Sequence, residues 1–135
     1  MKTYLLLLLV WLVEPLFAQH RFSKVLKDTP GVVSFTFRNE FSKDVPGTLD
    51  FIKEMGIRNM EFSNLFGKTA SEMRALLDSR GMVCTSFGVS YDALTNKTEE
   101  VIQNAKTLGA TFVRVGMIPH KGGFSVQEAD VAVTD

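Results

Sequence analysis

Polar side chains that could perform chemistry follow apolar runs of this sequence at similar intervals. Glu61 lies near the end of one run, Arg38 follows an earlier run, His120 follows a later one, and Phe87 closes another. A carboxylate among apolar residues needs either a charged partner or a function. Glu61 is therefore the strongest candidate for a substrate-binding residue, and the alternative is a salt bridge with Arg38 or Arg114.

The other candidates each have a functional and a structural interpretation. His120 could donate a hydrogen bond or carry a proton near neutral pH, or it could be a loop histidine without a role. Arg38 could contact substrate oxygen atoms, or it could lie in a solvated loop. Phe87 could form the apolar wall of a pocket, although a single aromatic residue is more often part of the core. Ser63 follows Glu61 closely and could hydrogen-bond a sugar hydroxyl group.

The sequence predicts neither a metal site nor a catalytic nucleophile. A catalytic metal usually needs about three protein ligands, and only Glu61 and His120 are well placed. The motifs Gly-x-Ser-x-Gly, Cys-x-x-Cys and His-Glu-x-x-His do not occur. The single cysteine, Cys84, lies in an apolar run without cationic neighbours, so we expect an unreactive core residue.

A repeated pattern of strand, helix and glycine must position these side chains. Runs rich in β-branched and aromatic residues predict four strands, at 32–37, 57–62, 82–87 and 111–115. Helical spacing of apolar residues predicts helices between and after them, over 45–55 and from about 69, 99 and 125. Thr69 and Ser125 each precede a glutamate by three residues, as in a capping box. Glycines end the first three helices, at Gly56, Gly81 and Gly109.

The order βαβαβαβα predicts an α/β fold whose neighbouring strands are parallel. An open doubly wound sheet and part of a barrel both fit this order. No glycine-rich turn follows the first strand, and the spacing of the units is nearly constant, which favours the barrel. A complete barrel needs about 250 residues. We therefore expect residues 31–135 to be the first four βα units of a (β/α)8 TIM barrel, truncated at the C-terminus.

The first residues have the composition of a signal peptide. Lys2 precedes an apolar run over 5–13, and the small residue Ala18 provides a cleavage site before Gln19. The run is too short to span a bilayer, and no cysteine follows Ala18 to carry a lipid anchor. We therefore expect a signal peptide over 1–18, a lead-in segment over 19–30, and export to the bacterial periplasm or medium. The alternative is a buried N-terminal helix.

The composition of the chain indicates which classes of partner it could bind. The chain has 135 residues, with 15 basic and 15 acidic side chains, which is enough for one domain. Nucleic-acid binding needs a concentrated basic surface, so neither DNA nor RNA is an expected partner. We expect a small-molecule ligand, no membrane anchor, and a possible homo-oligomer.

Four segments resemble the xylose-isomerase-like sugar (phosphate) isomerase/epimerase barrels, especially exported bacterial members. These segments are 34–38, 43–49, 56–62 and 112–120. The resemblance implies an isomerase or epimerase of carbohydrate metabolism that binds a divalent metal cation and a sugar-like hydroxycarbonyl compound. In the family, two acidic residues move a proton between adjacent carbon atoms while the metal polarises the substrate oxygens.

The resemblance carries over Glu61 and His120 as substrate-side residues only. The family's metal ligands lie on strands of the second half of the barrel, which this sequence does not contain, so we expect this chain alone to be inactive. The family's DNA-repair endonuclease branch has a histidine ligand where Phe87 and Gly88 stand here. A carbohydrate hydrolase or lyase barrel, and a non-enzymatic half-barrel that binds sugar, remain as alternatives.

Overall fold

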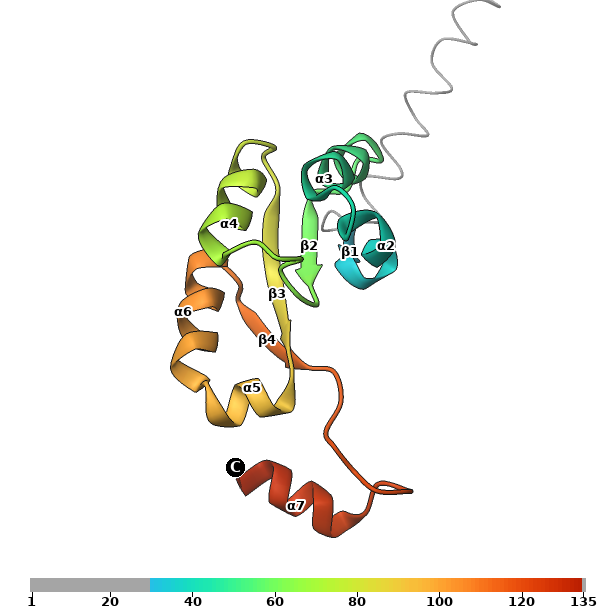
Figure 1. The fold of residues 1–135 in the computed structure, drawn as a ribbon, viewed down its shortest axis with the longest axis vertical. Coiled ribbons are helices and arrows are strands. Elements are labelled where there is room, and N and C mark those ends of the chain that lie inside the picture. The colour runs from blue at the N-terminus through green and yellow to red at the C-terminus, as the bar shows by residue number, and fades with distance from the viewer. Residues whose placement is uncertain (1–29, 135) are drawn as a thin grey trace, which may run out of the picture. The chain divides into compact units, whose positions relative to one another are not determined.

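The computed structural model describes residues 30–134, and the expected signal peptide and nearly all of the lead-in segment lie outside them. These residues form an α/β structure with a four-stranded parallel sheet in the order β1-β2-β3-β4 (Figure 1). The strands are β1 (Gly31–Val33), β2 (Asn59–Phe62), β3 (Val83–Val89) and β4 (Phe112–Val115). The expectation of four parallel strands, neighbouring in chain order, is confirmed.

Helices follow each of these strands. They are the 3-10 helix η1 (Ser34–Phe37), α2 (Arg38–Phe41), α3 (Val45–Glu54), α4 (Ala70–Asp78), α5 (Tyr91–Asn96), α6 (Thr98–Leu108) and α7 (Val126–Thr134). Within residues 30–134, no helix combines the length and the apolar character needed to cross a bilayer.

The first strand is shorter than the sequence predicts. We expected a strand over 32–37, but β1 ends at Val33 and the chain turns into η1. Ser34 is completely buried there, and its Oγ accepts a hydrogen bond of 2.9 Å from the backbone N–H of Ser63. A side-chain oxygen thus bonds to the N–H at the end of β2, where the expected strand would continue. As a consequence Arg38 begins α2 instead of lying in a loop, although its side chain is exposed as the solvated alternative expected.

The predicted helix starts are confirmed. The Thr69 hydroxyl oxygen accepts from the Glu72 N–H at 3.2 Å, and the Thr69 N–H donates to the Glu72 carboxylate at 2.7 Å. Ser125 and Glu128 form the same reciprocal pair at the start of α7. The helices η1, α2 and α5 were not predicted. Ser90 caps α5 by accepting from the Ala93 N–H at 3.0 Å.

The hydrophobic core lies between the helices and one face of the sheet. Leu49 and Ile52 of α3, Met73 and Leu77 of α4, and Leu108 of α6 are completely buried. They cluster with the strand residues Met60, Phe62, Cys84 and Phe87. Two predicted stripes depart from this pattern, because Met55 is 45% exposed after α3 and α7 buries none of its residues. The glycines behave as predicted: Gly56, Gly81 and Gly109 all have positive φ.

The other face of the sheet carries a different set of side chains. Glu61 pairs with Ser86, Ser86 with Phe112, and Gly88 with Arg114, so these residues share one face. A register shift after Met60 inserts Thr85 as an extra residue and brings Ser86 opposite Glu61. We call the face formed by Asn59, Glu61, Ser86, Gly88, Phe112 and Arg114 the open face, since the described helices bury their apolar residues on the opposite side.

Candidate functional site

An ion pair spans the open face. The Nε of Arg114 donates to Oε1 of Glu61 at 2.7 Å, and the Nη2 of Arg114 lies 2.5 Å from the same oxygen. The two side chains are 47% and 21% exposed, respectively. Of the two partners considered for Glu61, Arg114 is therefore the one that the structure pairs with it.

A glycine lies beside this pair on the strand between the two residues. Glu61 lies on β2 and Arg114 on β4, so β3 separates them. On β3, Gly88 pairs with Arg114 in the strand register. A Cβ atom at Gly88 would lie 3.2 Å from the Ser63 Cα and 3.7 Å from the Arg114 Nη2. A Cβ atom at position 88 would thus make an ordinary contact with the guanidinium, but it would crowd the backbone of β2.

The pair keeps part of its hydrogen-bonding capacity. Both contacts from Arg114 end on Oε1 of Glu61. Within the described residues, no side chain or backbone group bonds to Oε2 of Glu61 or to Nη1 of Arg114. A carboxylate oxygen is an acceptor and a guanidinium nitrogen is a donor. The pair therefore offers an acceptor and a donor on side chains that are partly exposed.

Hydroxyl groups hold the end of β2 in place beside this pair. The Oγ atoms of Ser34 and Ser63 lie 3.0 Å apart, and Ser34 also accepts the Ser63 N–H. Toward the other end of the strand, the Thr85 hydroxyl donates to the Asn59 side-chain oxygen at 2.9 Å. Glu61 therefore lies between two hydrogen bonds that link this strand to its neighbours and fix the backbone around it.

The structure does not bring the other predicted site residues into contact with Glu61. The Nη1 of Arg38 donates to the Phe35 carbonyl oxygen at 3.1 Å, and its guanidinium lies 4.5 Å from the centre of the Phe35 ring. The Nδ1 of His120 lies 2.9 Å from the Gly122 carbonyl oxygen, within its own loop. Phe87 is 6% exposed and belongs to the core on the opposite face.

The sequence alone did not reveal the roles of two residues near the site. Arg114 was considered only as an ion-pair partner of Glu61, and Gly88 was not considered as a spacer. The alternation of side chains along 57–62 and 111–115 could have placed Glu61 and Arg114 on one face. The register between them depends on the extra residue Thr85, however, and no pattern in the sequence marks that position.

The thiol of Cys84 is not a candidate nucleophile. Burial raises its pKa to about 11, against the weaker opposing effect of hydrogen bonds from the backbone. The thiolate is the reactive form of cysteine, so a buried thiol with this pKa is unreactive near neutral pH. The expected role of Cys84 as a core residue is confirmed.

The described residues do not fit the divalent metal that the family resemblance implies. Among residues 30–134, no three or more His, Cys, Asp or Glu side chains are grouped closely enough to hold an ion. Glu61 already bonds to Arg114, and His120 bonds within its own loop.

Comparison with known proteins does not assign this chain to a family. Neither the models of known protein families nor the curated protein sequences contain a match to this chain. The function must therefore be inferred from the sheet, its open face and the residues that this face carries.

Proposed function

We propose that this chain provides the first four βα units of a (β/α)8 barrel of the sugar isomerase/epimerase type, in which Glu61 and Arg114 bind a hydroxycarbonyl sugar. The observation that carries the proposal is the Glu61–Arg114 pair on the open face of a parallel sheet whose strands follow chain order. The isomerisation itself belongs to the complete protein, and the role assigned to this chain is substrate binding.

The arrangement of helices supports a barrel over a doubly wound sheet. A doubly wound sheet carries helices on both faces, whereas a barrel has its helices outside and turns the other face inward. Here α3, α4 and α6 contribute to one core on one face of the sheet. Phe112 and Val113 of β4 are 66% and 42% exposed. In a complete barrel, the remaining strands and helices would cover these two side chains, which lie on opposite faces of the sheet.

The position of the pair also supports a binding role. Glu61 is the third of four residues in β2, and Arg114 is the third of four in β4. In (β/α)8 enzymes, functional residues come from the C-terminal ends of several strands. Polar side chains directed into the barrel near this end would face the substrate.

The free atoms of the pair suit a compound with adjacent oxygen atoms. Oε2 of Glu61 can accept from a sugar hydroxyl group while Nη1 of Arg114 donates to a neighbouring carbonyl oxygen. Negative charge develops on that carbonyl oxygen when a proton leaves the adjacent carbon, and a fixed donor stabilises it. Glu61 also holds the guanidinium in place, so it acts as a substrate-binding and positioning residue. A metal bound elsewhere in the complete barrel would polarise the substrate oxygens.

Isotope exchange tests the proposal. The protein, purified from its own source, is incubated with a panel of ketoses and a divalent cation in D2O, and deuterium next to the carbonyl is measured by NMR. We expect Arg114→Lys to slow exchange by about 10² to 10³-fold, as the loss of a charge-stabilising donor does. Glu61→Gln should slow it by a similar factor, because the guanidinium would no longer be held in place. The matched control is Glu54→Gln, at an exposed position near the end of α3, which should leave exchange unchanged.

The alternative functions predict different results. Absence of exchange for every ketose would reject the isomerase proposal. Glycoside hydrolysis that depends on Glu61 would instead indicate a carbohydrate hydrolase. Saturable sugar binding without either reaction, weakened by Glu61→Gln, would indicate a non-enzymatic sugar-binding protein.

A further inference from the structure

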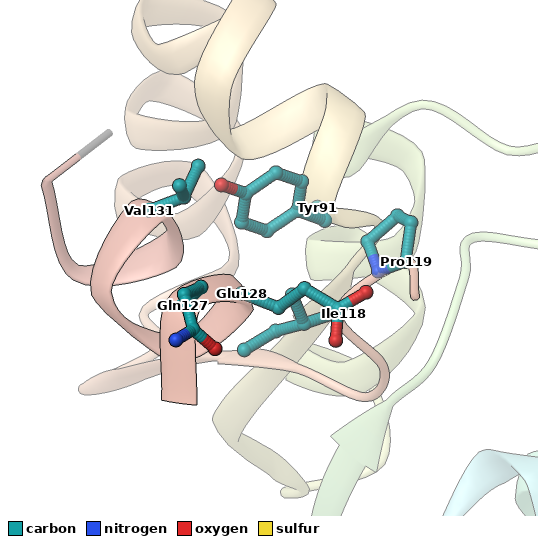
Figure 2. Close-up of a pocket in the computed structure, with 6 residues that line it drawn as sticks. All are labelled: Tyr91, Ile118, Pro119, Gln127, Glu128 and Val131. Atoms are coloured by element: carbon teal, nitrogen blue, oxygen red, sulfur yellow. The ribbon is translucent and has the colours of Figure 1, made fainter. Parts of the chain in front are cut away.

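A pocket lies between α5, the segment that follows β4, and α7. Its volume is about 290 Å³, close to the smallest size of small-molecule sites, which is roughly 300 Å³. Figure 2 shows the side chains that line it, with the Tyr91 side chain of α5 directed toward Val131 of α7. The lining residues are Tyr91, Ile118, Pro119, Gln127, Glu128 and Val131. None of them belongs to the open face.

The charge in this pocket comes from Glu128. Hydrogen bonds from the backbone N–H and the hydroxyl group of Ser125 lower the pKa of the Glu128 carboxyl group, with smaller contributions from Lys121 and His120. The carboxylate is therefore ionised at neutral pH. Because the capping box holds it in place, its position in the pocket wall is set before any ligand binds.

Glu128 keeps an acceptor for a ligand. Oε2 accepts both bonds from Ser125, at 2.8 and 2.9 Å, while Oε1 accepts only a longer bond of 3.3 Å from the Lys121 N–H. A carboxylate oxygen has two lone pairs. The second lone pair of Oε1 therefore has no hydrogen bond to any described residue.

We propose that this pocket binds a small organic cation, namely a primary alkylammonium ion with a short apolar chain. The ammonium group would donate to Oε1 of Glu128 and lie near the ring of Tyr91, since aromatic faces attract cations. The aliphatic side chains of Ile118, Pro119 and Val131 would contact the apolar chain. The neighbouring cationic groups do not occupy the site: Lys121 contributes a backbone N–H, and the His120 ring contacts Gly122 and Phe124.

Ligands of equal length and different charge test this proposal. Butylammonium, butanol and butyrate are titrated into the chain, and binding is followed by NMR through the methyl groups of Ile118 and Val131. We expect saturable shifts with butylammonium and affinities at least about tenfold weaker for butanol and butyrate, because a charge-assisted hydrogen bond is lost. Equal affinity for butanol, or shifts that never saturate with butylammonium, would overturn the proposal.

Three variants separate pocket binding from nonspecific effects. Glu128→Gln keeps a residue that fits the capping box but removes the charge, and should weaken butylammonium binding about tenfold. Val131→Trp should fill the pocket and abolish binding. The matched control Val126→Trp lies on the same helix, 72% exposed and outside the lining, and should bind like the parent. Retained binding in Val131→Trp would also overturn the proposal, and circular dichroism confirms that each variant remains folded.

Discussion

Arg114 reaches Glu61 across β3, a strand to which neither residue belongs. Its Nε lies 2.7 Å from Oε1 of Glu61, although β3 runs between their strands. Gly88 of β3 allows a close approach to β2, since a Cβ atom there would lie 3.2 Å from the Ser63 Cα and 3.3 Å from the Phe62 carbonyl oxygen. The ion pair therefore crosses the sheet beside a close approach of β2 and β3.

Replacing this glycine should destabilise the protein. In Gly88→Ala the new methyl group would crowd the backbone of β2, which cannot move as a flexible side chain would, and the free energy of unfolding should fall by about 1 kcal/mol or more. Gly88→Val should cost more still. The measurement is urea denaturation. Gly123→Ala is the control, because a Cβ atom at Gly123 meets nothing within 4 Å, and unchanged stability in Gly88→Ala would contradict the close approach.

The ion pair between Asp50 and Arg80 should give stability that depends on pH. Hydrogen bonding to Arg80 holds the pKa of Asp50 below its usual value of 3.8. A carboxyl group whose pKa is lower in the folded state stabilises the protein above the unfolded pKa, and this contribution is lost as pH falls through the folded pKa. Asp50→Asn should therefore lower the melting temperature at pH 7, and the difference from the parent should shrink as pH falls below 3.8.

The control for this prediction is Asp130→Asn, an exposed substitution on α7. Among the described residues Asp130 forms no ion pair, so its replacement should change the melting temperature little at either pH. A difference between Asp50→Asn and the parent that stays constant from pH 7 to pH 2.5 would contradict the role assigned to the carboxylate.

The cap of α4 should contribute measurably to stability. Thr69→Ala removes the hydroxyl oxygen that accepts the Glu72 N–H, and such N-cap losses cost about 1 kcal/mol. Thr107→Ala is the matched control, because Thr107 is exposed within α6, where alanine is the better helix former. Chemical denaturation of both variants should show a loss for Thr69→Ala and no loss for Thr107→Ala; the same result for both would contradict the prediction.

The thiol of Cys84 should react only when the core opens. Its pKa of about 11 and its burial predict slow modification by a disulfide reagent at pH 8. In urea above the unfolding midpoint, modification should become as fast as that of a free thiol. Rapid labelling of the folded protein would show that the region around Cys84 opens far more often than a core position should.

Cleavage of the expected signal peptide should give a defined new terminus. The small residue at position 18 predicts that exported protein begins at Gln19, and intact-mass spectrometry of material from outside the cytoplasm checks this. Ala18→Arg should block processing and leave the longer chain. Exported protein that still begins at Met1 would contradict the prediction.

The helix boundaries could be predicted because they depend on local chemistry. Thr69 and Ser125 find their glutamate partners three residues away, and Gly56 and Gly109 adopt positive φ at helix ends. These interactions join neighbouring residues, so the sequence pattern contains them completely. The same holds for the stripe of α6, where Val101, Ala105 and Leu108 are buried as their spacing predicts.

The features that could not be predicted depend on contacts between distant residues. The end of β1 at Val33 follows from a hydrogen bond between Ser34 and Ser63, which lie on different elements. The meeting of Glu61 with Arg114 follows from the register of three strands and from the extra residue Thr85. Side-chain alternation predicts faces but not registers, so the sequence offered Arg38 and Arg114 as partners of Glu61 without deciding between them.

The order of the strands determines when each part of the sheet can form. Every strand pairs with the strand before or after it in the chain, and paired residues are about 25 positions apart. Within the described sheet, no strand therefore needs a segment from far along the chain before it can pair. During synthesis β1, η1 and β2 can assemble before β4 has left the ribosome, and each later unit can add to a surface that already exists.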